Sequence, residues 1–376
     1  MSSAVTAVPG KNIQDIGSLS STRLTWIRFK RHRLAVASGI FLIAIYLIAA
    51  FCEFFAPYDP NWRNSKVIYG PPQEVNFVDS SGEFHLRPFV YGYTLHTNPD
   101  TWAREYEENT TKMFPLRFFS RGQDYQFWNL FETNIHFVTV ADNHYLHFFG
   151  TDKIGRDLFS RVIYGARTSL SLGLIGVVLT MFFGIVIGGL AGYYGGRIDS
   201  IIQRSIEIIQ SIPTLPLWMA LSAALPPHWS PLGVYFGIII ILSFIQWTGL
   251  ARVVRGRFLA LREEDFVVAA RLLGANQWRI IFKHLLPSFM SHIITTATLA
   301  IPSMILAETA LSFLGVGLRA PIVSWGVLLQ QAQNFQVIVL TPWLLIPGVF
   351  VVLVVIAFNL LGDGMRDAAD PYDGGH

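Results

Sequence analysis

The sequence predicts an all-α integral membrane protein with six transmembrane helices, cytoplasmic termini and a large extracytoplasmic insertion between helices 1 and 2. Hydrophobic residues make up 52% of the 376 residues and charged residues only 14%, whereas about a quarter of the residues of a soluble domain are charged. The mean hydropathy is correspondingly high, at +0.43. Long charge-free runs recur along the chain, and Lys and Arg gather in a few of the segments between them. A net charge of +3 distributed in this way does not indicate a nucleic-acid partner.

The charge-free runs supply the helices, because a crossing needs about 20 apolar residues whose backbone groups bond within the segment. The first helix is predicted at residues 34–56 and is expected to remain as an anchor, since no small-residue cleavage site follows it. The run Thr168–Gly196 holds glycines at spacings that favour close packing against another helix. The run Ile208–Ala251 is too long for one crossing and is divided by "PPHWSPLG", so it predicts two helices. The last two helices are predicted at His284–Ala307 and Val337–Leu361.

The Lys and Arg residues of the short segments predict the orientation. They are frequent in the N-terminal tail and between the fourth and fifth helices, and they are rare in the other short loops. We therefore expect both termini and the loop 252–287 to face the cytoplasm. The predicted organisation is a cytoplasmic tail (1–33), the first helix (34–56), an extracytoplasmic loop or cap domain (57–167), a five-helix core (168–362) that contains the loop 252–287, and a cytoplasmic C-terminal tail (363–376). The insertion is rich in Trp, Tyr, Phe and Pro. This composition fits two alternatives, a small folded cap or docking surface and a loosely ordered loop.

A polar, basic stretch, "FVVAARLLGANQWRIIFKHLLP", lies between the fourth and fifth predicted helices. It predicts a short helix capped by Asp265, a stop at Gly274 in the left-handed conformation, and a second helix capped by Asn276. Apolar residues at i, i+3, i+4 and i+7 define one face of this second helix: Trp278, Ile281, Phe282 and Leu285. Taken alone, such a stretch also fits an amphipathic helix that rests on lipid headgroups.

The same stretch resembles the cytoplasmic loop of binding-protein-dependent ABC importer permeases. The matching positions are Ala269, Ala270, Gly274, Leu286 and Pro287, while Val268 and His284 replace a glutamate and an isoleucine of the family pattern. In that family the loop forms a coupling helix that docks into a groove of an ATPase subunit. The resemblance implies that the following residues contact the ATPase: Phe266, Ala269, Ala270, Arg271, Gly274 and Ala275.

Other segments resemble the C-type permease subunit of dipeptide and oligopeptide importers. The run "FFGTDKIGRDLFSRVIYGARTSL" carries the outer-loop signature of that subunit, which includes Gly150, Thr151, Asp152, Gly155, Arg156, Asp157, Ser160 and Arg161. We expect its charged residues to form a hydrogen-bonded network that fixes the outer loop against the first helices. A catalytic or metal cluster is disfavoured, because no His accompanies them at ligand spacing. The resemblance leaves Asn61–His147 unmatched.

Two carboxylates lie near predicted helices, where charge is costly and often functional. Glu207 follows Arg204 by three residues, so a salt bridge between them is expected. Glu308 closes the fifth predicted helix. It either faces the translocation path or makes a structural contact with a sister subunit or with the following loop.

The resemblance implies a multi-pass permease subunit of an ATP-driven importer for peptides or peptide-like solutes in the bacterial inner membrane. The implied partners are a homologous second permease, two ABC ATPase subunits, an extracytoplasmic solute-binding protein and the lipid bilayer. ATP and Mg are expected on the ATPases, and the chain itself is expected to hold no cofactor, no metal and no catalytic residue. Oligosaccharides and nickel chelates stay open as other substrates.

Two other protein classes compete with this interpretation. An ion-coupled secondary transporter is disfavoured, because the sequence shows no internal repeat with paired broken helices. A membrane enzyme with a catalytic outer domain is disfavoured, because the Asp, Glu and His residues of that region are scattered. The sequence also contains no G-x-x-x-x-G-K-[ST] phosphate loop, so the chain is not expected to hydrolyse ATP itself.

Overall fold

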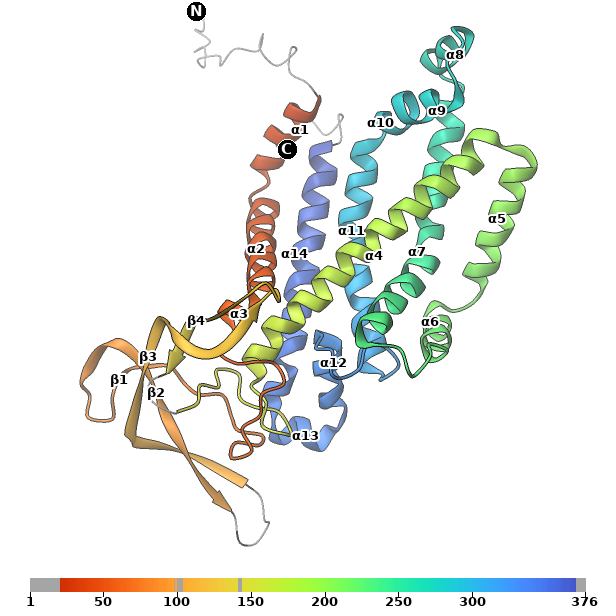
Figure 1. The fold of residues 1–376 in the computed structure, drawn as a ribbon. Helices are drawn as coiled ribbons and strands as arrows, with labels where there is room; N and C mark the ends of the chain where they lie inside the picture. Colours follow the sequence, from red (N-terminus) through yellow and green to blue (C-terminus); the bar gives the residue numbers. More distant parts are fainter. Residues whose placement is uncertain (1–20, 98, 100–103, 141–143, 370–376) are drawn as a thin grey trace, which may run out of the picture.

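The computed structural model describes residues 21–97, 99, 104–140 and 144–369. Within these ranges, five helices are long and apolar enough to cross a membrane by their length and composition. They are α2 (Arg33–Ala50), α4 (Leu158–Tyr194), α7 (Pro231–Leu261), α11 (Met290–Phe313) and α14 (Ile346–Ala369). Figure 1 shows them standing side by side, with α1 (Ser21–Arg31) and the end of α14 at one end of the bundle and a β-sheet at the other.

The third predicted crossing is not a continuous helix. In its place the chain forms α5 (Gly196–Ser211) and the short apolar helix α6 (Thr214–Ala223). The break has a local cause, because a residue that precedes proline is pushed out of the helical region, and Ile212 before Pro213 is extended. The expected salt bridge on α5 is present, with 2.9 Å between Arg204 Nη1 and Glu207 Oε2.

The insertion corrects the all-α prediction, because it forms a four-stranded antiparallel sheet in the order β1-β2-β3-β4. The strands are β1 (Asn76–Val78), β2 (Phe84–Thr97), β3 (Arg104–Phe127) and β4 (Phe131–Val140). Aromatic and β-branched residues favour strands, and the prolines fall at positions that tolerate them. Pro115 lies where β3 changes its partner from β2 to β4, so its missing N–H costs little. Val90, Leu116, Val138 and Leu146 form the core beneath the sheet.

The helical core depends on small residues of α4, as their spacing predicted. A Cβ added to Gly184 would stand 2.8 Å from the Leu250 side chain, and one added to Gly192 would stand 2.6 Å from Phe258 Cβ. The two helices α4 and α7 therefore approach more closely than larger residues would allow. On the other side of α4, residues of α2, α12 (Trp325–Leu329) and α14 form a second buried cluster around Trp325 and Leu170.

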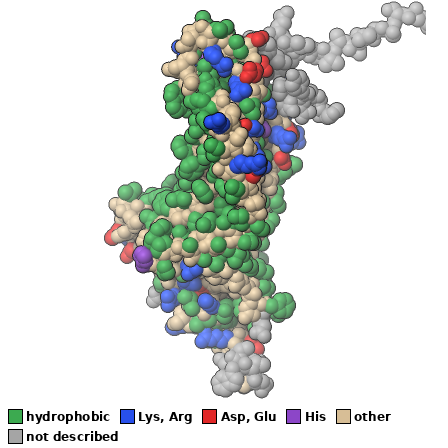
Figure 2. All heavy atoms as spheres, turned by 90° about the vertical axis from the view of Figure 1, so that its right-hand side faces the viewer, with side chains coloured by type: hydrophobic (Ala, Val, Ile, Leu, Met, Phe, Trp, Pro, Cys, Tyr) green, Lys and Arg blue, Asp and Glu red, His purple; other side chains and the backbone are tan. Residues whose placement is uncertain are grey.

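Several short elements complete the chain. Helix α3 (Cys52–Phe55) follows α2 directly, and α4 begins well before residue 168, because the Asp157 side chain caps it by accepting from Ser160 N at 2.7 Å. The remaining elements are α8 (Asp265–Leu272), α9 (Gln277–Arg279), the π-helix η2 (Ile280–Leu285), α10 (Leu286–Ser288), η3 (Gln330–Gln333), α13 (Phe335–Leu340) and η4 (Pro342–Leu345). Figure 2 shows a face on which apolar side chains fill the middle, while Lys and Arg gather toward both ends.

Candidate functional site

The segment from α8 to α10 lies at the same end of the molecule as the described ends of the chain, and opposite the sheet (Figure 1). Large apolar side chains of this segment point away from the protein. Leu272 is 83% exposed and Leu273 is 88% exposed, and Trp278 stacks on Phe282 with 5.7 Å between exposed rings. Apolar surface of this kind marks a place where another surface packs.

The opposite side of this segment is anchored in the bundle. Val267 and Ile280 are buried in one cluster with Val254 and Phe258 of α7 and with Ile293 of α11. The Tyr194 hydroxyl at the end of α4 also donates to Gln277 Oε1 at 2.7 Å. A force applied to α8 is therefore transmitted to the ends of α4, α7 and α11.

The turn inside this segment has the predicted geometry, with two corrections. Gly274 has φ +79°, which favours glycine, and Asn276 Oδ1 accepts from Arg279 N at 2.8 Å. Asp265 is the first residue of α8 and not its cap, since Glu264 precedes it without a side-chain cap bond. The predicted apolar face is also wrong, because the π-helical turns bury Ile280 together with Leu285 and leave Trp278 and Phe282 outside.

The residues predicted to touch an ATPase lie together on the outer side of α8 and its turn. Phe266, Ala269, Arg271 and Gly274 are exposed, and Ala270 and Ala275 are partly buried. A Cβ built on Gly274 would have no atom of the described chain within 4 Å, apart from those of its own residue and its two neighbours. The surface is thus open to a partner, and its role as an ATPase contact stays a prediction.

The outer-loop signature residues come together around the buried carboxylate of Asp152. Its Oδ2 accepts from Arg156 Nε at 2.7 Å and from Arg161 Nη1 at 3.3 Å, and its Oδ1 accepts from the Arg156 amide at 3.0 Å. Gln331 Nε2 reaches the same Oδ2 at 3.5 Å from η3. The group joins the loop before α4 to the segment after α12.

The neighbouring signature residues bind the segment that follows the first helix. Thr151 Oγ1 donates to Val67 O at 2.6 Å and accepts from the Gly70 amide at 2.8 Å, while Gly155 O accepts from the Asn64 amide at 2.8 Å. Gly150 and Gly155 have φ of +71° and +77°, a conformation that other residues rarely adopt.

His147 is a member of this group that sequence analysis missed. Its Nδ1 lies 3.0 Å from Asp157 Oδ1, and both side chains are buried. Asp157 Oδ2 also accepts from Ser160 Oγ at 2.7 Å. Nearby, burial lowers the pKa of His144, whose ring stacks on Phe114 with 3.6 Å between centroids. The spacing of His147 to Asp157 in the sequence gave no sign of this contact, since the intervening loop folds back.

Glu308 is 0% exposed and lies among three serine hydroxyls. Ser312 Oγ and Ser324 Oγ donate to its Oε1 at 2.8 and 2.7 Å, and Ser169 Oγ donates to Oε2 at 3.2 Å. The serines in turn accept from backbone amides of Leu318, Val327 and Trp325. The carboxylate therefore holds the loop between α11 and α12 against α4, and whether it also lines a path stays a prediction.

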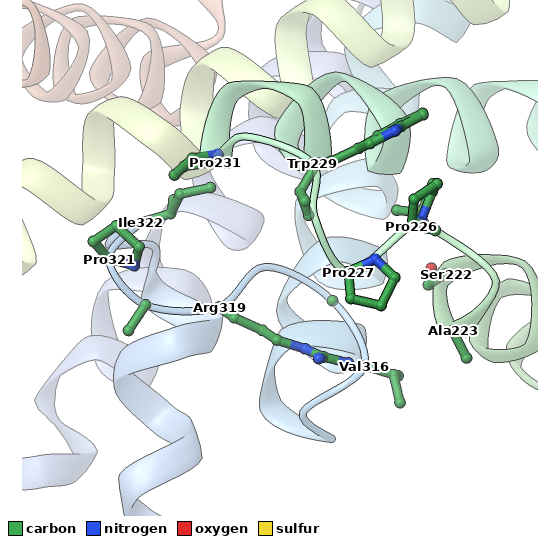
Figure 3. A pocket seen from close by; sticks show the side chains of 14 residues that line it. Ser222, Ala223, Pro226, Pro227, Trp229, Pro231, Val316, Arg319, Pro321 and Ile322 are labelled. Atoms are coloured by element: carbon green, nitrogen blue, oxygen red, sulfur yellow. The ribbon is translucent and has the colours of Figure 1, made fainter.

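A cavity of about 260 Å³ lies at the end of the bundle away from α8. Its walls are the turn between α6 and α7, with Pro226, Pro227 and Trp229, and the loop after α11, with Arg319 and Pro321 (Figure 3). The predicted turn at Pro226–Gly233 is thus present, and Ser230 Oγ caps α7 by accepting from the Gly233 amide at 3.1 Å.

One further grouping of ligand-type side chains lies in the described part of the sheet. Asp79, Glu83 and His85 bring carboxylate and imidazole atoms within 4.8 Å of one another. Asp79 already accepts from Ser81, Glu83 and His85, and the His85 contact, the largest cause, holds the pKa of this carboxyl well below its usual range. These hydrogen bonds stabilise the turn that joins β1 to β2, and this structural role explains why the three side chains lie together.

Sequence comparison decides the family. Residues 184–372 match the binding-protein-dependent transport system inner membrane component family, a range that contains α8 to α10 and Glu308. The chain belongs to this family. Residues 20–72 match the N-terminal transmembrane domain of oligopeptide transport permease C. The strands β1 to β4 fall between the two matched ranges, so the sheet of this family member has no counterpart in either.

Relatives of this permease family member include peptide transport proteins. The dipeptide transport system permease protein DppC of Bacillus subtilis is 44% identical over 227 residues, which cover 60% of this chain and 68% of that protein. The oligopeptide transport system permease protein OppC of Haemophilus influenzae is 41% identical over 229 residues, which cover 60% of this chain and 71% of that protein.

Solved structures of ABC transporters resemble this chain more distantly. A subunit of the MetNI methionine ABC transporter in an inward-facing conformation is 19% identical, with a TM-score of 0.42, and the match covers 57% of this chain and 98% of that one.

Proposed function

We propose that this chain is the C-type permease subunit of an ATP-driven importer that moves peptides or peptide-like solutes across the bacterial cytoplasmic membrane. It pairs with a homologous second permease, and two ABC ATPases bind the pair on the side of α8. A solute-binding protein delivers the solute on the side of the sheet. ATP and Mg bind to the ATPases, and this chain holds no cofactor.

One observation supports this proposal beyond family membership: one side of α8 is exposed, while its other side is packed into the helix bundle. Its outer side is open and apolar at Leu272 and Leu273, whereas Val267 is fully buried against α7. A helix that only rested on headgroups would need no such anchoring. A helix that transmits motion needs both an accessible surface and a rigid attachment.

The remaining crossing of a six-helix permease is made in this proposal by α5 and α6 together. Residues 196–223 would span about 40 Å if fully helical, at 1.5 Å per residue, which is enough for a bilayer. Figure 1 supports the assignment, since α5 and α6 run in succession from the α8 end to the opposite end. Exposed Ile198, Ile201 and Ile208 supply an apolar outer face. With six crossings, residues 1–33 and 363–376 face the cytoplasm and residues 57–167 face outward.

Transport then follows an alternating-access cycle. Closure of the ATPase pair draws the two coupling segments together, and the buried cluster around Phe258 passes this movement to α7 and α11. The mouth of the path opens at the far end, where the loop held by Glu308 and the turn at Pro226 meet. The peptide class of solute is supported by the names of the relatives, DppC and OppC.

Copurification of the tagged full-length chain tests the docking step. Ala270→Glu puts a charge on the outer side of α8 and should lower the recovered ATPase at least severalfold, while the amount of chain in the membrane stays unchanged. Ser81→Glu adds the same charge at an exposed turn of the sheet and should leave ATPase recovery unaltered. Equal ATPase recovery from both variants would refute docking at α8.

Uptake into proteoliposomes tests the transport class. Labelled dipeptide should accumulate only with ATP on the ATPase side, and a proton or sodium gradient should not replace ATP. Uptake that follows the gradient alone would instead support a secondary transporter.

A further inference from the structure

The tip of the β3–β4 hairpin is apolar, uncharged and exposed. Residues 127–131 read "FWNLF", with Leu130 79% exposed and Phe131 58% exposed. Trp128 and Asn129 both have positive φ, of 50° and 56°, and Leu130 N donates to Phe127 O at 2.8 Å. This conformation is unusual for a bulky residue, so the tight turn presents Trp128 at a cost in backbone strain.

Contacts fix the depth of this tip relative to the first membrane helix. Trp128 Nε1 donates to the carbonyl of Ala50, the last residue of α2, at 2.9 Å. Phe127 stacks on Phe51, the next residue of the chain, with 5.8 Å between ring centroids. Figure 1 shows the hairpin rising from the sheet to the end of α2 beside α3.

An ion pair marks the boundary of the apolar layer at the same level. Arg167 is the last charged residue before the run that begins at Thr168, and Glu53 is the first charged residue after α2. Arg167 Nη1 donates to Glu53 Oε1 at 2.7 Å, and the Arg167 guanidinium lies 4.4 Å from the Trp128 ring centroid.

We propose that residues 127–131 insert into the interface between water and lipid on the sheet's side of the membrane, and so anchor the sheet to the bilayer. The partner is the headgroup and upper acyl region of lipid. Trp at this depth, with a polar N–H bonded and its ring exposed, is typical of aromatic belts. The tip is also continuous with the exposed apolar face of α2 at Ile43, Leu47 and Phe51.

Another exposed apolar residue of the sheet gives a contrast. Leu86 is 90% exposed, but it lies on β2 close to Asp79, Glu83, His85 and Arg87. Charged neighbours of this kind suit water. The five residues of the tip from Phe127 to Phe131 carry no charge themselves, and of the charged residues beside them Arg167 is paired with Glu53 and Glu132 accepts from Gln126. Leu86 is therefore the matched control position for an exposed leucine on the same sheet.

Spin labelling of the full-length chain tests the anchor. Leu130→Cys and Leu86→Cys are labelled with a nitroxide, in the transporter reconstituted with its associated subunits in phosphatidylcholine and phosphatidylglycerol vesicles. The native Cys52 stays in place, because its side chain is fully buried and therefore reacts poorly with the label. Power saturation then compares collisions with oxygen, which concentrates in lipid, and with nickel-EDDA, which stays in water.

The expected result is a severalfold higher ratio of oxygen to nickel-EDDA accessibility at position 130 than at position 86. A nickel-EDDA accessibility at 130 equal to that at 86 would mean that the tip lies in water, and the anchor would be rejected. Protection of 130 from both reagents would mean that protein covers the tip, which also rejects the lipid anchor. Phe131→Cys repeats the measurement one residue along, so that the result does not depend on a single label.

ATPase recovery is measured on the same samples, which separates failure of the anchor from failure of the docking proposal.

Discussion

Buried polar residues of this chain act as connectors between distant segments. Asp152 joins the loop before α4 to Gln331 after α12, and Glu308 joins α4 and α11 to the loop that carries Ser324. Both carboxylates are enclosed by donors of the chain itself. Such groups are stable only while their partners are complete, because an unpaired buried charge is costly.

Asp152→Ala should therefore destabilise the folded chain strongly. The substitution leaves Arg161, which is buried, without its carboxylate, and the loss of one partner of a buried pair costs about 3–5 kcal/mol. Thermal unfolding in detergent should show a clearly lower midpoint for this variant. Lys153→Ala changes an exposed neighbour and should leave the midpoint nearly unchanged. Equal midpoints would mean that Asp152 is not needed to hold the loop.

At this scale the sequence predicted part of the network and missed part. The family signature brought Asp152, Arg156 and Arg161 together, because they lie within one turn and the start of one helix. It did not predict His147 beside Asp157 or the serines around Glu308. Those contacts depend on how separate loops return to the same point, and single-chain spacing does not encode this.

At the scale of elements, the segment from α8 to α10 is built around one special turn. Gly274 ends α8 in the left-handed conformation, and Asn276 starts the next helical turn. Close packing of Val267 and Ile280 fixes the two pieces to the same cluster. The turn geometry therefore determines how the outer side of α8 is presented.

Gly274→Val should weaken coupling without removing the chain from the membrane. A β-branched residue at φ +79° is strained even though the space around Gly274 is open. We expect a severalfold loss of ATPase recovery and of ATP-dependent uptake. Gly256→Val is the matched control, because Gly256 also has open space but lies in α7 outside the left-handed region. A loss of the same size in the control would attribute the effect to added bulk and not to the turn.

Helices and strands could be predicted from the sequence where one pattern, such as a long run without charged residues, dominated a segment. The long charge-free runs predicted α2, α4, α7, α11 and α14, since only helices satisfy the backbone in an apolar layer. Of the two helices predicted from the run Ile208–Ala251, the second is present as α7, but the first is not continuous, because Pro213 breaks it. The sheet was hidden by prolines that read as loop signals, although Pro115 lies where β3 changes partner.

At the scale of the whole molecule, the chain separates two working ends. The α8 end carries the exposed apolar surface at Leu272 and Leu273, and the other end carries the sheet and the cavity near Arg319. The base of the insertion is closed by Gln73, which accepts from the His147 amide at 2.7 Å, and by Tyr58, whose hydroxyl accepts from the Leu146 amide at 2.7 Å. These two contacts lie outside the strands, while the sheet is tied to the base and to the first helix by other contacts, among them His136 Nδ1 at 2.7 Å from Ala56 O and Trp128 Nε1 at 2.9 Å from Ala50 O.

Replacement of residues 76–140 by a short Gly–Ser linker should separate the two ends in function. The change removes β1 to β4 but keeps the Asp152 network and the contacts of Tyr58 and Gln73. We expect ATPase recovery to stay near that of the intact chain, because the contacts that anchor the α8 segment in the described part of the chain come from α4, α7 and α11. Uptake of peptide supplied by the binding protein should fall severalfold, since the sheet is the large exposed structure on that side. Copurification and proteoliposome uptake on one preparation measure both quantities. Loss of the ATPase together with uptake would contradict this separation and would mean that the sheet organises the membrane bundle itself.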